Sequence, residues 1–579
     1  MLKRIFSAVL SVFVALSAFS SVAFAETTSD LNKGYWQLQP KFNAAKTNGD
    51  DAAIITTGSE IIKLFTGLSP GGNEADFTKK AAELKAAGKN LTIDITYGAL
   101  NDVANAYEDS GKLNEAAVAF KNLLPLAYVY REVMPSVNPA FVQSDFDFTI
   151  SIIKNKIAYL DIQAAVYVET KTDGGVFYGA KFEPKSGIYY GQAFNGDHNS
   201  VKNTKAENAA KKSSGQLIYV QFENEKIESY DWLFQKSKAN HSVIEVAWNL
   251  KNEGSSLKDV LNQRSKIESA VKYLNTLNTP ILLRFGAEMN VWENKANPED
   301  FIKAFQFVAD IAHKNASNVA MVWSPNSIGH KDSTYEEFYP GDSYVDWVGI
   351  SLYTMYYFKG DKNQDENTQQ LYMTGKYANP IQLAEPIILA FGDRKPIMFA
   401  EGGVENYSVT NKEDLSDWAV YQLDILYGYA PVIYPQVKAM FYFDKFIDGE
   451  KNRFSLYDND KLNTKYLELV NNPYFLEKGK TSAGISYKKA GAEEIKVPAA
   501  SVPLITYAPY FTKKNVSVTY RVDNNWVGAS SELPYRQNFD FSGLSDGEHT
   551  LEAVVQSGED VLFTSSLKII KSGATIEIK

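Results

Sequence analysis

Apolar residues follow different spacings in successive parts of the chain. From about residue 30 to 170 they recur mostly at helical spacing, with little strand-like alternation. From about residue 176, short apolar runs alternate with longer amphipathic stretches, which is typical of alternating strands and helices. After about residue 475, a connector rich in Lys, Gly and Ala leads into strand alternation with turn signals. The pattern predicts a multidomain chain with helical, α/β and β regions in this order.

The clearest helical signal lies between Ala99 and Leu124. Its spacing resembles one tetratricopeptide helix pair, with Gly111 at the turn, Ala116 at the helix contact and Pro125 closing the second helix. We therefore expect a helical, tetratricopeptide-like region over residues 26–175, which could dock a protein partner. A generic helical bundle without a binding role remains open, because a stable array usually needs several stacked repeats.

The α/β region, residues 176–475, contains eight apolar runs. They are residues 187–192, 217–221, 243–249, 281–288, 319–326, 347–353, 396–401 and 439–443. Eight strands separated by spacers long enough for helices predict a (β/α)₈ TIM barrel. The spacer after the fourth run begins with Asn297 and Pro298, which predicts a capped amphipathic helix. A doubly wound nucleotide-binding sheet would need a glycine-rich turn after its first strand, and the sequence has none there.

The C-terminal part divides into a predicted linker, residues 476–504, and a predicted immunoglobulin-like β-sandwich, residues 505–579. Residues 516–522 and 550–555 alternate as strands do, and Asp- and Asn-containing turns flank them. This region contains Trp526 and several tyrosines. Carbohydrate binding and a plain spacer role both remain open for it.

Composition narrows the classes of function. The chain of 579 residues has 59 basic and 69 acidic residues, a net charge of −10, and no basic run stands out, which argues against nucleic acid as a partner. It has no cysteine and five scattered histidines, so we expect neither disulfides nor a transition-metal site. No metal ion and no cofactor are predicted.

The N-terminus has the features of a signal peptide. Lys3 and Arg4 precede an apolar stretch that runs from Ile5 to about Phe19, and residues 23–25, Ala-Phe-Ala, fit the small-residue rule for cleavage. We expect residues 1–25 to be removed and the mature protein to be secreted or displayed at the cell surface. No later segment is apolar enough to span a membrane.

Two of the apolar runs reach a glutamate: Glu288 in the fourth run and Glu401 in the seventh. At the carboxyl ends of barrel strands, both side chains would open onto the face where such barrels place their active sites. Two carboxyl groups there can hydrolyse a glycosidic bond, with retention at a spacing of about 5–5.5 Å and inversion at about 6.5–9.5 Å. The sequence leaves the spacing open, and surface or salt-bridged carboxylates are the plain alternative.

Around these glutamates the sequence resembles glycoside hydrolase family 26. The matching motifs are Arg-Phe-x-x-Glu-Met-Asn at 284–290, Val-Trp-Ser-Pro-Asn at 322–326, Tyr-Pro-Gly-Asp at 339–342 with Val-Asp-Trp-Val-Gly-Ile at 345–350, and Phe-Ala-Glu at 399–401. The resemblance implies a retaining endo-β-glycanase, with mannan as the default polysaccharide substrate. Glu288 would be the acid/base, and Glu401 would be the nucleophile.

The same resemblance suggests supporting residues. Arg284 would keep the nucleophile ionised, and Tyr353 would orient it through a hydrogen bond. Further residues with a predicted substrate-binding or supporting role are Asn290, Asn326, Trp292, Trp248 and Trp323. Each of these tryptophans could stack on a sugar ring or pack in the core, whereas core packing is favoured for Trp347.

One position departs from the family pattern. Members that cleave mannan typically have histidine directly before the acid/base, whereas this chain has Ala287, whose side chain cannot donate a hydrogen bond. The substrate sugar is therefore open, as is the position's effect on activity. Two other functions remain: an inactive barrel that binds carbohydrate at the cell surface, and a scaffold whose outer regions dock other proteins.

Overall fold

The structure is a computed structural model that describes residues 31–160, 164–173, 175–193, 205, 209–250, 257–291, 297–329, 334–356, 358, 379–445, 449–510 and 515–579. It forms two compact units, residues 1–161 and 162–579. The predicted signal peptide, residues 1–25, lies outside the described residues. No described helix is long and apolar enough to cross a membrane.

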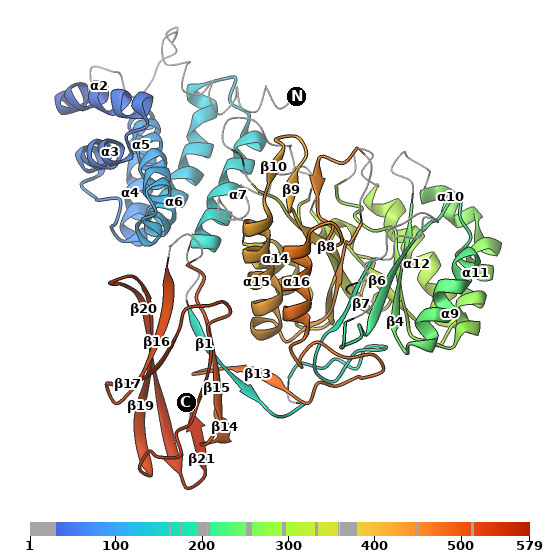
Figure 1. The fold of residues 1–579 in the computed structure, drawn as a ribbon. Helices are drawn as coiled ribbons and strands as arrows, with labels where there is room; N and C mark the ends of the chain where they lie inside the picture. The colour runs from blue at the N-terminus through green and yellow to red at the C-terminus, as the bar shows by residue number, and fades with distance from the viewer. Residues whose placement is uncertain are drawn as a thin grey trace. The chain divides into compact units, whose positions relative to one another are not determined.

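The first unit is helical, as predicted (Figure 1). Its helices are α2 (Lys33–Asn48), α3 (Asp51–Thr66), α4 (Glu74–Ala86), α5 (Asn90–Asp109), α6 (Leu113–Val137) and α7 (Gln143–Leu160). The predicted pair corresponds to α5 and α6, with Gly111 in the left-handed region at φ 73° between them and Ala116 fully buried. The tetratricopeptide-like character of the unit stays a prediction.

Pro125 does not end the second helix of this pair, contrary to the sequence prediction. α6 continues through Pro125 to Val137. Leu123, Leu126 and Ala127 on either side of the proline are fully buried. Tertiary packing of this apolar face therefore outweighs the local preference of proline to break a helix.

The second unit contains the predicted barrel. Its parallel strands are β2 (Tyr189–Gln192), β3 (Gly215–Gln221), β4 (Val243–Asn249), β5 (Ile281–Phe285), β6 (Val319–Trp323), β7 (Trp347–Thr354), β8 (Ile397–Val404) and β11 (Val437–Tyr442). They pair in the order β2-β11-β8-β7-β6-β5-β4-β3. A parallel bridge between Ala193 and Leu217 joins the two outer strands. Each predicted apolar run thus corresponds to one barrel strand, and the predicted fold class is confirmed.

Helices cover the outside of the barrel. They are α9 (Asp231–Ala239), α10 (Leu257–Asn262), α11 (Arg264–Leu277), α12 (Pro298–Asn315), α14 (Pro380–Phe391), α15 (Ser416–Ile433) and α16 (Asp460–Val470), with short 3₁₀ turns η3 (Ile227–Tyr230) and η4 (Glu336–Phe338). α12 begins as predicted, because the Asn297 side chain accepts hydrogen bonds from the backbone N–H groups of Glu299 and Asp300.

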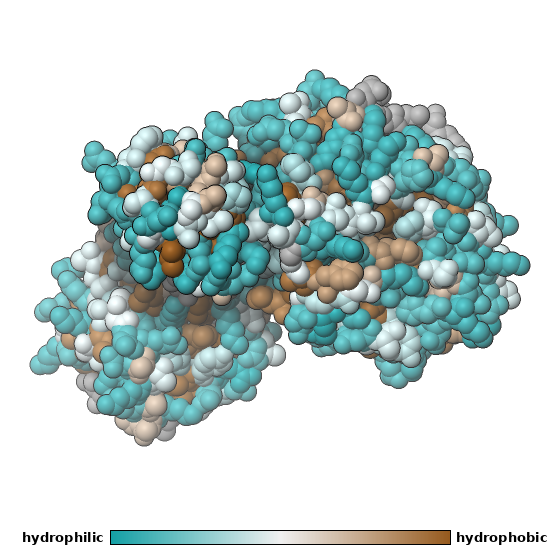
Figure 2. All heavy atoms as spheres, turned by 90° about the horizontal axis from the view of Figure 1, so that it is seen from below, coloured by the Kyte–Doolittle hydropathy of each residue, from teal (hydrophilic) through white to brown (hydrophobic). Residues whose placement is uncertain are grey.

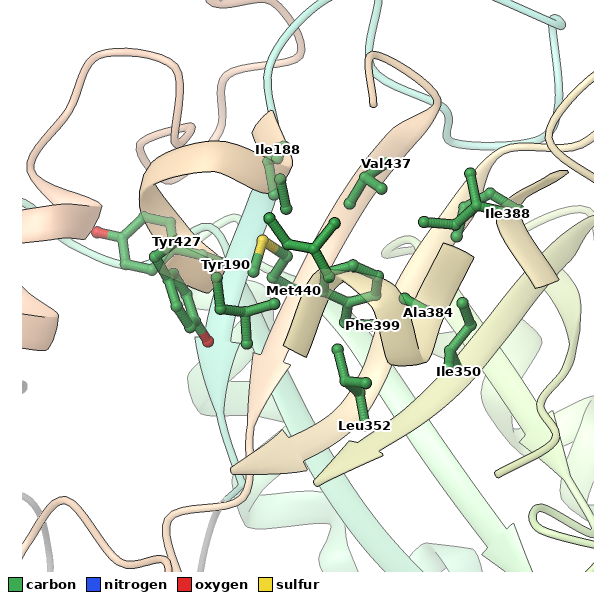
Figure 3. Packing of buried hydrophobic residues seen from close by; sticks show 14 of the residues in the cluster. Ile188, Tyr190, Ile350, Leu352, Ala384, Ile388, Phe399, Tyr427, Val437 and Met440 are labelled. Atoms are coloured by element: carbon green, nitrogen blue, oxygen red, sulfur yellow. The ribbon is translucent and has the colours of Figure 1, made fainter. Parts of the chain in front are cut away.

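Alternate strand residues pack on opposite sides of the barrel wall. Figure 3 shows Ile350, Leu352 and Phe399 on the outer side, packed toward Ala384 and Ile388 of α14. Leu282, Met398 and Ala400 belong instead to the cluster that fills the interior, as do Val243 and Ala247. Successive residues along a strand therefore point in turn into the interior and toward the helical layer, and this alternation also decides where side chains at the carboxyl ends of the strands point.

Two antiparallel sheets, built from residues after the barrel together with β1 before it, fit the predicted C-terminal β-sandwich. One sheet has the order β13 (Ser486–Lys489), β1 (Ala165–Thr170), β15 (Val502–Tyr507), β18 (Arg536–Phe539). The other has the order β14 (Ile495–Pro498), β21 (Thr575–Ile578), β20 (Asp560–Ser572), β19 (Gly547–Ser557), β16 (Val516–Val522), β17 (Asn525–Ser530). Their immunoglobulin-like character stays a prediction.

The strands of these sheets correct the secondary structure predicted for two segments. β1 lies in the part predicted to be helical, and β13 and β14 lie in the predicted linker. β1 pairs with both β13 and β15, and its residues alternate between half-buried and buried positions because only one face of the sheet is fully packed. The predicted domain boundaries themselves stay predictions.

The barrel and these sheets share one hydrophobic core cluster. The Tyr429 hydroxyl of α15 donates a hydrogen bond of 3.0 Å to the backbone oxygen of Thr506 in β15. A small sheet of β9 (Tyr407–Ser408), β10 (Glu413–Asp414) and β12 (Asn452–Arg453) lies beyond β8. On the face shown in Figure 2, hydrophilic residues dominate and hydrophobic ones form scattered patches.

Candidate active site

Glu401 reaches the barrel interior because of an irregularity in β8. Ile350 of β7 is paired with Phe399, but the next residue, Ser351, is paired with Glu401, so Ala400 is an extra residue. Phe399 faces the outer helices and Ala400 faces the interior. Strict alternation would turn Glu401 outward, and the bulge lets it face inward as well.

Glu288 lies in a turn three residues beyond the end of β5, not within the strand as the sequence suggested. Its φ of 61° is in the left-handed region, and Gly286 before it has φ 59°. The Glu288 N–H donates a hydrogen bond of 2.8 Å to the backbone oxygen of Ser324, just after β6. A left-handed glutamate is unfavourable in isolation and marks a site where the surroundings fix the backbone. The turn thereby directs the carboxyl group over the barrel mouth.

Two predicted residues, Asn290 and Asn326, hold this turn in place. The Asn290 side chain accepts a hydrogen bond from the Asn326 N–H and donates one to the Asn326 backbone oxygen, each at 2.9 Å. The Asn326 amide then donates to Glu288 Oε1, also at 2.9 Å. Asn326 therefore contacts the predicted acid/base directly, and Asn290 acts through it.

Arg284 and Tyr353 both contact Glu401. The Nη2 atom of Arg284 donates a hydrogen bond to Glu401 Oε2, and the Arg284 side chain is fully buried. The Tyr353 hydroxyl donates to Glu401 Oε1 at 2.6 Å. The Tyr353 ring is held edge-on against Phe454 and Phe443, with centroid separations of 4.9 and 5.7 Å. Each oxygen of Glu401 thus has its own donor, Tyr353 from the adjacent strand β7 and Arg284 from β5 across the barrel interior.

The two glutamates have opposite pKa shifts. Burial and then the negative charge of Glu401 raise the pKa of Glu288 to about 7, although Arg284 opposes the rise. Burial would also raise the pKa of Glu401, but the charge of Arg284 and the hydrogen bonds from Tyr353 and Arg284 outweigh it and lower that pKa. Just below pH 7 the site therefore holds mainly a protonated Glu288 and an ionised Glu401, a division of roles suited to acid and nucleophile.

Two residues near Glu401 were missed by the sequence reasoning. The hydroxyl of Tyr219 on β3 contributes to the lowered pKa of Glu401, and the ring lies below Arg284, 5.9 Å from the guanidinium carbon. Glu245 on β4 is fully buried, and its Oε1 lies 3.0 Å from Arg284 Nε. Glu245 could have been identified from the sequence, because a glutamate in the middle of an apolar strand, at a position that faces the interior, needs a partner.

The predicted tryptophan platforms are not at the site. Trp248 and Trp323 are buried, with exposed fractions of 1% and 0%. Trp248 packs between Phe222 and Phe285, and Trp323 against Tyr339 and Phe391. Both side chains point outward from their strands, into the layer between barrel and helices. Neither offers an exposed ring to a sugar, so the stacking role is wrong for both.

The other positions singled out from the sequence near the site are Trp347, Trp292 and Ala287. Trp347 is buried in the barrel interior and donates a hydrogen bond of 2.8 Å to the Lys181 backbone oxygen, in agreement with the core role favoured for it. Trp292 lies outside the described residues. Ala287 is half-buried in the turn beside Glu288, and its methyl group offers no hydrogen-bond donor.

No cluster of metal-ligating side chains occurs among the described residues. The site brings together its carboxyl groups, the guanidinium of Arg284 and the hydroxyl groups around Glu401. This arrangement can protonate a leaving group on one side and present an ionised carboxylate on the other.

Residues 191–414 match the model of the family described as "Glycosyl hydrolase family 26". The chain contains a glycosyl hydrolase family 26 domain. The matched range extends from the first barrel strand to just beyond the seventh and includes both Glu288 and Glu401.

Two curated relatives align with part of the chain. A β-1,3-xylanase from Alcaligenes sp is 26% identical over 165 residues, 27% of this chain and 33% of the relative. The β-1,3-xylanase TXYA from Vibrio sp is 25% identical over 163 residues, 27% of this chain and 34% of the relative. The alignments thus span about a third of the length of each relative.

Solved structures that match part of the chain include two whose descriptions name GH26. The β-mannanase BoMan26A of Bacteroides ovatus has a TM-score of 0.37 at 15% identity, covering 52% of this chain and 92% of its own. GH26C from a Muricauda species has a TM-score of 0.37 at 14% identity, covering 50% of this chain and 87% of its own.

Proposed function

We propose that this protein hydrolyses β-glycosidic bonds of a polysaccharide by double displacement, with Glu288 as acid/base and Glu401 as nucleophile. The observation that carries the proposal is the opposite shift of the two carboxyl pKa values at one mouth of the barrel. The family 26 domain spans both residues and supports the same assignment.

In the first step, the ionised Glu401 attacks the anomeric carbon while Glu288 donates its proton to the leaving glycosidic oxygen. Arg284 and Tyr353 hold the two oxygens of Glu401 in a fixed orientation, so little reorganisation precedes the attack. Formation of the ester neutralises Glu401, and the leaving sugar departs with the proton.

In the second step, water replaces the leaving group. Loss of its proton leaves Glu288 ionised, and Glu288 now accepts a proton from this water, which attacks the anomeric carbon and releases Glu401. Neutralisation of Glu401 in the ester removes a negative charge beside Glu288, so the pKa of Glu288 falls at this stage. The lower pKa keeps Glu288 ionised at neutral pH, so that it is available as the base. The second displacement restores the original anomeric configuration.

Glu401→Ala and Glu288→Ala test these roles directly. Reducing-sugar release should be lost in Glu401→Ala, and added azide should restore cleavage by giving a glycosyl azide of inverted configuration. In Glu288→Ala, azide should give a product of retained configuration, because the covalent step through Glu401 still occurs. Glu299→Ala, at an exposed position of α12, is the control and should behave as the wild type.

Activity that survives in Glu401→Ala without azide would overturn the assignment of the nucleophile. An initial product of inverted configuration from the wild type, read by proton NMR, would overturn double displacement. No release from any polysaccharide, together with binding of one of them, would favour the alternative of a carbohydrate-binding barrel.

For the substrate, we propose a β-linked polysaccharide and give β-1,3-xylan the first trial, because both curated relatives are β-1,3-xylanases. Mannan was the default from the sequence, but Ala287 provides no donor where mannan-cleaving members have histidine. A panel of β-1,3-xylan, β-1,4-xylan, galactomannan, glucomannan and mixed-linkage glucan compares these classes. Highest kcat/KM on a mannan would overturn the xylan preference, and the length of the products would distinguish endo from exo cleavage.

We also propose that the protein is exported after removal of residues 1–25. The proposal rests on the basic start, the apolar stretch and the Ala-Phe-Ala site at 23–25. N-terminal sequencing of the exported protein should begin at Glu26. An intact Met1 on the mature protein would overturn it.

A further inference from the structure

Glu245 is a buried carboxyl group that double displacement does not use. It lies on β4 between Val243 and Ala247, which both face the barrel interior, and it has no exposed surface. Its Oε1 is 3.0 Å from Nε of Arg284 on the neighbouring strand. Neither oxygen of Glu245 makes a well-directed hydrogen bond to a described residue. A carboxyl group is costly to bury in this way, so its presence calls for a function.

The guanidinium of Arg284 lies between two carboxyl groups. Its Nη2 donates to Glu401, and its Nε is next to Glu245. The titratable groups that act on Glu245 from the facing strands are Arg284 on β5, Glu401 on β8 and Tyr219 on β3. If both carboxyl groups were ionised, one cation would be shared between two anions in a site that excludes water.

We propose that Glu245 is a positioning residue for the nucleophile: its protonated carboxyl group fixes the Arg284 guanidinium beneath Glu401 and leaves the positive charge of Arg284 to Glu401. The inference rests on the proposed function and adds a residue to it. One buried cation facing one buried anion is favoured over one cation facing two. In agreement, burial raises the pKa of Glu245 to about 8, although Arg284 opposes the rise.

A neutral Glu245 that positions Arg284 and an ionised Glu245 that competes for its charge predict different effects of two substitutions of similar size. Glu245→Gln preserves an oxygen beside Arg284 Nε and resembles the protonated acid. Glu245→Leu fills a similar volume but removes the oxygen, so the guanidinium loses its support on that side. If Glu245 were instead ionised and competing for Arg284, both substitutions would free the charge of Arg284 for Glu401 and lower the pKa of Glu401.

The test is the pH dependence of kcat/KM for the full chain, whose acid limb reports the ionisation of Glu401. In Glu245→Gln the acid limb should stay within about 0.3 pH units of the wild type, whereas Glu245→Leu should raise it by about 1 unit. Misplacement of the guanidinium should also lower kcat about tenfold in Glu245→Leu, with KM within about twofold. Acid limbs that fall in both variants, or that are unchanged in Glu245→Leu, would overturn the proposal.

A second measurement does not need activity. In protein labelled with δ-¹³C-glutamate, the Glu245 carboxyl signal is the one missing from Glu245→Gln. It should remain at its protonated position up to about pH 7, because burial and the neighbouring anion favour the neutral acid. Titration of this signal at the ordinary pKa of a glutamate would overturn the proposal, even if Glu245→Leu does not fold. A protein that cleaves no polysaccharide but keeps a protonated Glu245 would refute the hydrolase function alone.

Discussion

Tyr353→Phe is the most direct test of how the nucleophile is kept ionised. The substitution removes one hydroxyl group, which donates 2.6 Å to Glu401 Oε1, and leaves the ring that packs on Phe454 and Phe443. Hydrogen bonds to charged groups contribute about 1.5–3 kcal/mol. At about 1.4 kcal/mol per pKa unit, the pKa of Glu401 should rise by about 1–2 units.

The sign of the effect on activity follows from this shift. The hydrogen bond favours the ionised carboxylate, so its loss moves the acid limb of kcat/KM to higher pH by about 1–2 units. The assay is the initial rate on a soluble β-glycan from pH 3 to 9. Tyr429→Phe is the control, because it also loses a buried hydroxyl hydrogen bond, here to the Thr506 backbone oxygen, without touching the site. An acid limb in Tyr353→Phe that coincides with that of the control would refute the reasoning.

Three further substitutions test the fold around the site. Burial raises the pKa of Glu405 to about 8. The stability that its protonated form contributes is complete below about pH 4.5 and is lost as the pH rises through 8. In urea unfolding from pH 5 to 9, Glu405→Gln should therefore gain about 1–3 kcal/mol relative to the wild type, and parallel curves would contradict this. Trp323→Ala should lower the free energy of unfolding by about 3–5 kcal/mol with KM nearly unchanged, since the ring is in the core; a raised KM at full stability would restore its role in sugar binding. A methyl group in Gly402→Ala would lie 2.1 Å from the Leu352 backbone oxygen, so β7 and β8 must separate beside Glu401, and both the melting temperature and kcat should fall; unchanged values would show that the close approach of Gly402 to Leu352 is not needed.

The barrel could be predicted from the sequence because its information is local. Each strand is a short apolar run, and the order of the runs sets the order of the strands. The outward direction of Trp248 and Trp323 could also have been predicted, because alternation along their strands places both side chains on the outer side of the barrel. The predicted stacking role was wrong because it followed from the position of both tryptophans near strand ends, whereas the alternation along the strand decides where the side chains point.

The orientation of Glu401 was not within reach of the same reasoning. Counted along β8, alternation from Met398 turns the glutamate away from the interior, and only the extra residue Ala400 turns it back. A bulge depends on the pairing with β7, which no local pattern in residues 397–404 reveals. Likewise, β1 could not be assigned to the C-terminal sheets, because its partners lie far along the chain.

β1 also sets the order in which this protein can fold during synthesis. Thr170 and Ser486, whose side chains share a hydrogen bond of 2.8 Å, are 316 residues apart, and the whole barrel lies between them. A ribosome therefore produces β1 first and its partners β13 and β15 only after the last barrel helix, so both edges of β1 lack these partners throughout that interval. The pairing of β1 with β13 and β15 therefore closes a long loop that contains the whole barrel, and contacts of such high sequence separation form slowly.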